Sequence, residues 1–369
     1  MNGMMLIFFM IIFLPVAILF VFMPYVTRKT ECFGVTIPAD MATHADVQQL
    51  RKKYVKSSAL YQVILLFLIL VGAFLPIKEE WIEALFSGVV LLQIVIMFLL
   101  YLYFHKRAKV FKLVHFGTES NSKNIVSIST NFREERLIVS NVWFLIPLVI
   151  VIFTIFVSLK MYDQIAQHIP TNYNFKGDPV NFTEKTYRTV LLLPAVQLFM
   201  TILFLFVNIM ISKAKQQLSG ENPQAAMKRN IIFRRRWSAF MVLTAILCSV
   251  MFAVHQLSLI YELPSTLLMM TPILFTLILI AGCVYLTFTT GQGGSRIKLA
   301  DSETSPVVNR DDDQHWKLGM FYFNRQDPSI FIEKRFGVGW TNNWARPLSW
   351  VMIIVIVALA VGLPLILSN

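Results

Sequence analysis

The chain has 369 residues, of which 56% are hydrophobic and 15% are charged, and its formal net charge is +12. Soluble proteins carry about 25% charged residues, so 33 basic and 21 acidic side chains are too few for a soluble chain of this length. Three cysteines exclude a disulfide scaffold. The composition predicts a polytopic membrane protein.

The apolar residues are gathered in runs that lack Asp, Glu, Lys and Arg. A membrane-spanning helix needs about 20 such residues, and the runs that reach this length cover residues 1–27, 57–77, 84–104, 137–159, 189–212, 237–261, 263–295 and 347–369. We therefore expect an all-α polytopic membrane protein with eight transmembrane helices. The first run has no basic segment before it, which favours a retained span over a signal peptide.

The loops between these runs differ in basic content. Those after the first, third, fifth and seventh runs hold 28 of the 33 Lys and Arg residues and 14 of the 21 acids. Basic loops stay in the cytoplasm, so we expect a multi-pass protein of the plasma membrane with both termini extracytoplasmic. The same charge predicts contact with anionic head groups of the lipid bilayer, densest at Arg234, Arg235 and Arg236, rather than with nucleic acid.

Two of the cytoplasmic loops carry short local patterns. Residues 45–54 predict a short amphipathic helix at the inner membrane surface, after a turn at Gly34 and Pro38. The glycine-rich residues 291–295 lack the Lys-Ser/Thr ending of a phosphate-binding loop. We interpret them as a flexible exit from the seventh span.

The last cytoplasmic loop has the alternating pattern of a small β-hairpin. Residues 316–323 alternate as a strand, residues 324–328 supply turn residues, and residues 329–335 resume a strand pattern. Two strands are not stable alone, so the hairpin is expected to pack on another loop, the membrane or a protein partner. Residues 336–343 predict a turn back to the eighth span. The acidic residues 311–313 predict a solvated turn, since consecutive carboxylates do not converge on one metal ion.

The outer loop between the fourth and fifth runs concentrates turn-forming residues. Residues 168–179 contain two prolines, one glycine and four potential side-chain caps. This density predicts a turn rather than a strand. It is compatible with plain chain reversal or with a binding loop, since a reversal alone needs fewer residues.

Two segments resemble known families. Residues 169–174 (IPTNYN), then 177–179 (GDP) and 192–194 (LLP), resemble the motif of the SdpI-like membrane proteins of Gram-positive bacteria and of a larger family known only as a domain of unknown function. Residues 316–328 and 336–341 are similar to a second unknown-function domain that often accompanies it. Asn172 stands where the family usually has His, and Val180 where it usually has Asp, so these two departures put in doubt any metal, proton or pH-sensing role that the family's His and Asp would have here.

The resemblance implies two sets of site residues. In the family, SdpI confers immunity to a secreted peptide toxin and holds a transcriptional repressor at the membrane, which implies an extracellular peptide ligand and a cytoplasmic protein partner. The ligand-binding candidates in the outer loop are Pro170, Asn172, Tyr173, Asn174, Gly177, Asp178 and Pro179. The partner-binding candidates are Trp316, Gly319, Tyr322, Asn324, Asp327, Phe336, Gly337 and Trp340.

These observations divide the chain into five segments. We expect a three-span region at 1–141, an SdpI-like unit at 142–212, spans six and seven at 213–295, a cytoplasmic hairpin domain at 296–346 and the last span at 347–369.

The spans contain few groups suited to chemistry. No Asp or Glu lies in any of the runs, and the amides of Gln93, Gln197, Asn208 and Gln256 are expected to bridge helices. The cysteines lie on different segments without a neighbouring histidine. We therefore expect no catalysis, no cofactor and no metal site, and a function in binding and sensing. The alternatives are a permease for an uncharged or lipid-like substrate, with the amides as its polar lining, and a structural subunit of an envelope complex.

Overall fold

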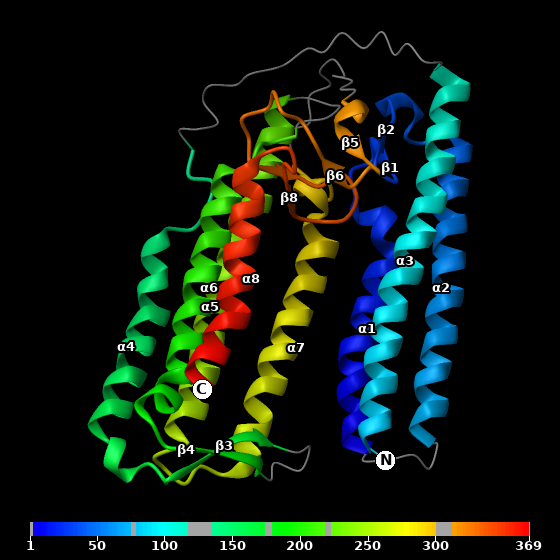
Figure 1. The fold of residues 1–369 in the computed structure, drawn as a ribbon. Helices are drawn as coiled ribbons and strands as arrows, with labels where there is room; N and C mark the ends of the chain where they lie inside the picture. Colours follow the sequence, from blue (N-terminus) through cyan, green and yellow to red (C-terminus); the bar gives the residue numbers. More distant parts are fainter. Residues whose placement is uncertain are drawn as a thin grey trace. The chain divides into compact units, whose positions relative to one another are not determined.

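A computed structural model describes residues 3–74, 79–116, 135–173, 179–217, 223–299 and 312–368. The described residues form eight α-helices, shown in Figure 1. They are α1 (Gly3–Val26), α2 (Ala45–Phe74), α3 (Glu79–Phe116), α4 (Leu145–Lys160), α5 (Tyr187–Lys213), α6 (Pro223–Leu257), α7 (Ser265–Thr290) and α8 (Pro347–Ser368).

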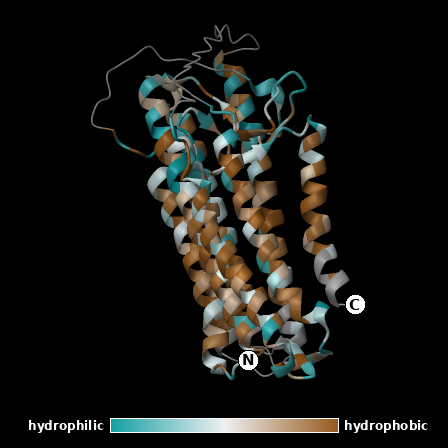
Figure 2. Ribbon diagram, turned by 90° about the vertical axis from the view of Figure 1, so that its left-hand side faces the viewer, coloured by the Kyte–Doolittle hydropathy of each residue, from teal (hydrophilic) through white to brown (hydrophobic). Residues whose placement is uncertain are grey.

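Seven of these helices are long and apolar enough to cross a membrane, by length and composition. In α8 the qualifying apolar segment, Pro347–Gly362, is shorter. Figure 2 shows the hydrophobic residues along the helices and the hydrophilic residues concentrated in the loops. The expectation of a polytopic helical protein is thus confirmed, whereas the eighth span stays a prediction.

Four short antiparallel strand pairs connect the helices in the described parts of the chain. They are β1 (Glu31–Cys32) with β2 (Val35–Thr36), β3 (His168–Tyr173) with β4 (Pro179–Glu184), β5 (Trp316–Lys317) with β6 (Phe321–Tyr322), and β7 (Phe331–Glu333) with β8 (Trp340–Asn342).

The chain divides into two compact units. Unit 1 comprises Met1–Arg136, Ala214–Phe233 and Cys283–Arg346, and unit 2 comprises Leu137–Lys213, Arg234–Gly282 and Pro347–Asn369. Helices α6 and α7 each contribute residues to both units, because the boundaries fall within them. The five-segment division expected from the sequence stays a prediction.

Unit 1 is built on α1, α2 and α3, which lie side by side in Figure 1. Apolar side chains such as Phe13, Leu65 and Phe86 fill the space between these helices. Their one described amide pair, Gln93 Nε2 to Gln62 Oε1 at 2.9 Å, joins α3 to α2. Packing of apolar faces therefore holds this bundle, with one polar bridge fixing its register.

Unit 2 is held by amides that join its helices. Gln197 of α5 donates to the Ser249 carbonyl of α6 at 2.9 Å and accepts from Thr154 of α4 at 2.8 Å. Gln256 donates to the Ser158 hydroxyl at 2.8 Å. Asn208 accepts from the Ser238 hydroxyl at 2.6 Å. The prediction that the amides of the spans bridge helices is confirmed for all four.

The last loop does not form the single hairpin that its alternating pattern predicted. Residues 316–323 fold back on themselves as β5 and β6 through a three-residue loop, 318–320, in which Leu318 and Gly319 are the central turn residues, and residues 331–342 form a second hairpin. Both turn residues have positive φ, +53° and +68°, which is the type I′ geometry that closes tight hairpins. A turn inside an alternating segment leaves the alternation intact, so the pattern alone could not reveal it.

Other local expectations need correction. Residues 45–54 are the first turns of the continuous helix α2, not a separate short helix. Arg234 is fully buried and donates to the Ile211 carbonyl at 2.7 Å, so it is not available to lipid head groups, unlike its exposed neighbours Arg235 and Arg236. Residues 168–173 form strand β3, with register shifts after Pro170, where a turn was expected.

Two glycine turns meet on helix α3. The β1–β2 turn at Phe33 and Gly34 also has positive φ at both residues, +49° and +78°. A β-carbon on Gly34 would lie 2.4 Å from the Gly319 carbonyl oxygen and 2.7 Å from the Tyr101 hydroxyl. Gly34 and Gly319 therefore both require glycine, for backbone conformation and for space.

We expect Gly34→Ala to lower the free energy of unfolding by more than the ~1–2 kcal/mol that positive φ alone costs an L-residue. Gly337→Ala is the matched control, because Gly337 has φ +88° and a β-carbon there would meet only Met23 Sδ at 3.6 Å. Thermal unfolding of the detergent-purified variants measures both. Equal destabilisation of the two would contradict the close contact between the turns.

Candidate functional site: a buried charge network beside a pocket

The loops of unit 1 gather into one structure at one end of α1–α3. We call it the loop cluster and define it as residues 28–44, 214–217, 223–233, 291–299 and 312–346. These five ranges come from three parts of the chain that are far apart in sequence, so the cluster can hold a site that no single loop provides.

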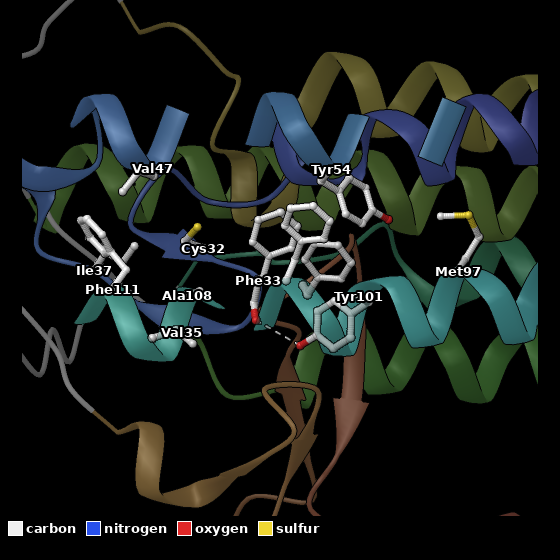
Figure 3. Close-up of a cluster of buried hydrophobic side chains, with 12 residues drawn as sticks. Cys32, Phe33, Val35, Ile37, Val47, Tyr54, Met97, Tyr101, Ala108 and Phe111 are labelled. Atoms are coloured by element: carbon white, nitrogen blue, oxygen red, sulfur yellow. Dashed lines mark hydrogen bonds between the residues drawn. The ribbon is translucent and has the colours of Figure 1, made fainter. Parts of the chain in front are cut away.

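Aromatic packing anchors the loop cluster to the helices. The Phe33 ring packs against Tyr54 of α2, with ring centroids 5.2 Å apart (Figure 3). It also packs against Phe104 of α3, with ring centroids 5.3 Å apart. The Phe33 carbonyl lies 2.7 Å from His105 Nδ1 and 3.2 Å from the Tyr101 hydroxyl. The same hydroxyl lies 2.8 Å from the Leu318 carbonyl, so Tyr101 touches both glycine turns.

Glu333 is the first of two centres of buried charge. Its carboxylate is fully buried, pairs with Arg28, and accepts from Asn230 Nδ2 at 2.7 Å. Arg28 also reaches Glu31 at 3.4 Å and donates to Gln217 Oε1 at 3.2 Å. One carboxylate thus joins β7, the segment after α1 and the start of α6.

Arg335 is the second centre and lies two residues farther along. Its guanidinium pairs with Asp312 and Asp313 and donates to the Gly34 carbonyl at 3.2 Å. Asp313 in turn pairs with Lys112 of α3 at 2.7 Å. The expectation of a solvated acidic turn is therefore wrong for Asp312 and Asp313, whose carboxylates neutralise a cation that is only 1% exposed; Asp311 lies outside the described residues.

Asp327 organises the hairpins around these centres. Its carboxylate accepts from the Tyr322 hydroxyl at 2.7 Å and pairs with Lys215 at 2.5 Å. The buried amide of Asn343 donates to the Asn324 carbonyl at 2.8 Å and the Ser329 carbonyl at 3.1 Å. The two hairpins are joined through these polar groups and through one backbone bridge between Tyr322 and Asn343, without forming one continuous sheet.

Most of the partner-binding candidates predicted from the sequence lie inside the loop cluster and make contacts within it. Trp316, Tyr322, Asp327 and Phe336 are buried, and their contacts are internal. Gly319 packs against His105. The other candidates, Asn324, Gly337 and Trp340, belong to the same hairpins. Contact of these residues with a protein partner stays a prediction.

The outer-loop candidates lie on the β3–β4 hairpin of unit 2. Pro170 faces Phe182, Asn172 faces Asn181, and Tyr173 faces Pro179 in the strand register. Asn174, Gly177 and Asp178 lie outside the described residues. The hairpin is tied to its helices by Lys185, which donates to the Ile165 carbonyl at 2.9 Å. Ligand binding by this loop stays a prediction.

Burial sets the protonation of the carboxyl groups in the loop cluster. Loss of water around Glu31 raises its pKa to about 7, although Arg28 and Arg335 oppose the shift. Burial would also raise the pKa of Asp327, but hydrogen bonds from Lys215, Tyr322 and Ser329 outweigh it and lower that pKa to about 2. Glu31 is therefore a carboxyl group that changes charge near neutral pH.

A pocket of about 210 Å³ opens beside Arg28. Its lining comes from the segment after α1, the start of α6 and residues 292–295. Gly293 and Gly294 have positive φ, and β-carbons there would lie 2.7 Å from Arg28 and 2.4 Å from the Arg229 carbonyl oxygen. The expected flexible exit after α7 is in fact a closely packed turn that forms one wall of this pocket.

One group of described residues offers metal ligands. Donor atoms of His44, Asp46 and His115 lie within 4.8 Å of one another. Asp46 and His115 are exposed, and His115 Nδ1 lies 3.0 Å from the Phe111 carbonyl of its own helix. Such exposed groups also gather without an ion, so this cluster carries no functional conclusion here.

Sequence reasoning missed the residues that form the charge network. From the sequence, Arg28 and Glu31 enter only as loop charges, Glu333 and Arg335 only as part of a predicted strand segment, and Asn230 is not singled out. A usable signal existed in the segment 333–335, where three consecutive charged residues interrupt a strand pattern beside Phe331 and Phe336.

Comparison with known families finds one match for each of the two motif segments. A model described as "Domain of unknown function (DUF1648)" matches residues 149–198, and one described as "Family of unknown function (DUF5808)" matches residues 325–350. No curated protein and no solved structure matches the chain. The first match covers the β3–β4 hairpin, most of α4 and the first half of α5, and the second covers the β7–β8 hairpin. The recognition of two unknown-function segments is confirmed, and the SdpI-like assignment stays a prediction.

Glu31 makes a specific pH dependence testable. Its pKa is higher in the folded protein than the ordinary value of 4.5, so the folded state binds the proton more tightly and stability falls as the pH rises from 4.5 to 7. We expect Glu31→Gln to raise the melting temperature at pH 8, where it removes a cost of about 3 kcal/mol, and to have little effect at pH 5. Glu262→Gln, at an exposed site, is the control. An equal effect of Glu31→Gln at both pH values would contradict the assignment.

Proposed function

We propose that this chain is an integral membrane protein that works by binding and sensing, of the SdpI-like type, in toxin-peptide immunity or envelope signalling. In this proposal the β3–β4 hairpin takes an extracellular peptide or lipid ligand. The loop cluster then passes the bound state to a cytoplasmic protein partner. The protein acts without catalysis.

The observation that carries the proposal is the buried charge network of the loop cluster. Buried ion pairs add little net stability compared with apolar packing, and removing one partner is costly. Arg28, Glu333 and Arg335 each connect segments from different parts of the chain. A displacement of one segment would therefore unpair a charge in another, and such all-or-none coupling is suited to a sensor.

Helix α6 offers a covalent route between the two motif regions. Asn230 in its first turns donates to Glu333 in unit 1, and Gln256 near its end donates to the Val190 carbonyl at 3.0 Å in unit 2. Val190 lies on α5, directly after the β3–β4 hairpin. The proposal is that a ligand on the hairpin acts on Glu333 through this helix.

The contacts within the helices favour binding over transport. A permease for an uncharged substrate would need polar groups left available along its path. The four amides considered for that lining are engaged in helix–helix hydrogen bonds. No observation favours a structural subunit over the sensing proposal.

The proposal predicts a phenotype confined to secreted peptides and envelope agents. Deletion of the gene is expected to sensitise cells to at least one such agent, and Tyr173→Ala or Asn174→Ala to reproduce this without lowering the abundance of the protein in the membrane. Glu184→Gln, on the same hairpin outside the motif, serves as control. Unchanged sensitivity of the deletion strain across a panel of agents would sink the immunity function.

Orientation can be tested separately by cysteine labelling. In a background without native cysteines, a membrane-impermeant maleimide applied to intact cells is expected to label Asn174→Cys and to spare Lys228→Cys, an exposed position on α6. Lysed cells should label both. Labelling of Lys228→Cys in intact cells would reverse the proposed orientation.

A further inference from the structure

Among the described residues, the pocket of the loop cluster is lined by basic side chains and by no acidic ones. Arg28, Lys29 and Arg229 contribute to its wall, and no Asp or Glu is among the described lining residues. Glu31 and Glu333 pair with Arg28 and so balance part of the positive charge of the pocket wall. These three cations and two carboxylates leave the site net positive even with both acids ionised. An anion is therefore favoured in the pocket over a neutral or cationic group.

Several buried polar atoms in the pocket wall have no partner within the described protein. They are Gln217 Nε2, Arg229 Nε and Ser295 Oγ. Gln217 is only 6% exposed, and leaving such a donor unsatisfied costs about 1–3 kcal/mol. Buried polar groups without partners are uncommon, and three around one pocket point to a ligand that accepts hydrogen bonds.

The orientation of Gln217 is set by its neighbour. Its Oε1 accepts from Arg28 Nη1 at 3.2 Å, and Arg28 is itself held by Glu333. Because the acceptor end of the amide is engaged in this contact, the donor end is the one left for the pocket. The wall therefore presents N–H and O–H donors, matched to acceptor oxygens.

The size of the pocket narrows the ligand class. A volume of about 210 Å³ equals that of about seven water molecules at about 30 Å³ each and lies below the 300–1,000 Å³ of sites for drug-sized ligands. A single phosphate group fits this space, and guanidinium groups recognise phosphate through charge-assisted hydrogen bonds.

We propose that this pocket binds a phosphate group, held by Arg229, Lys29 and Gln217 against the turn at Gly293 and Gly294. The phosphate belongs either to a free anion or to the head group of an anionic lipid, since both present the same oxygens. The site lies in unit 1 and does not depend on the β3–β4 hairpin, so the inference goes beyond the proposed function and can hold if that function fails.

The test uses the full-length protein in nanodiscs. In the first arm, phosphatidylcholine nanodiscs are titrated with inorganic phosphate and with pyrophosphate, and affinity is measured by calorimetry. In the second arm, nanodiscs contain a fraction of phosphatidylglycerol, and the lipid retained by the protein is quantified by mass spectrometry. Saturable binding in the first arm identifies a free anion, and selective retention in the second identifies a lipid head group.

Arg229→Gln is expected to weaken binding in the responsive arm about tenfold or more, as for loss of one charge-assisted hydrogen bond. Lys228→Gln is the matched control, because it removes the same charge from an adjacent, exposed position of α6 that does not line the pocket. It should change affinity less than twofold. Ser295→Ala, a smaller change, should also weaken binding, and the melting temperature without ligand reports whether each variant is folded.

The proposal would be overturned by either of two results with folded variants. One is that neither phosphate, pyrophosphate nor phosphatidylglycerol binds the wild-type protein selectively. The other is that Arg229→Gln and Lys228→Gln weaken binding equally, which would indicate attraction to surface charge without a built site. Neither result bears on sensitivity to secreted peptides, so this inference and the proposed function fail independently.

Discussion

A buried charge must be neutralised and hydrogen-bonded close to where it lies, and the loop cluster depends on this constraint. Glu333 and Arg335 lie two residues apart on the same short segment and carry opposite charges. Arg28 pairs with Glu333, and Asp312 and Asp313 pair with Arg335. Because an unpaired ion in this interior would cost several kcal/mol, the partners fix where the segments after α1, before α6 and after α7 can lie.

The glycine positions follow from the same requirement. The segments can approach closely enough to pair their charges only where side chains are missing. Gly293 leaves room for the Arg28 guanidinium, and Gly34 leaves room for the Gly319 carbonyl above Tyr101. Positive φ at these residues then turns the chain tightly enough to return to the next segment. Close approach and tight turning thus work together around the aromatic group of Phe33, Tyr54 and Tyr101.

Polar groups have different surroundings in the helices and in the loop cluster. In the helices, the amides of Gln93, Gln197, Asn208 and Gln256 each bond to a neighbouring helix, so they contribute to packing. In the loop cluster, ion pairs satisfy most charged groups, yet donors around one pocket remain without a partner. The outer hairpin belongs to a family match that is independent of this cluster. The loop cluster thus holds the buried ion pairs and the donors around the pocket, while the described helices provide a scaffold with little titratable chemistry.

The amino-acid sequence by itself determined the helical membrane character, the helix-bridging role of the four amides and the two segments of family similarity. These properties depend on the length of apolar runs and on local motifs, which are written along the chain. Only the tertiary structure decided that residues 316–323 close their own hairpin, that Asp312 and Asp313 neutralise Arg335, and that residues 291–295 form a pocket wall. The first depends on a turn hidden inside an alternating segment, the second on partners 22 and 23 residues away, and the third on packing against Arg28, far back in the chain. Local pattern carries no information about which distant charge will meet which.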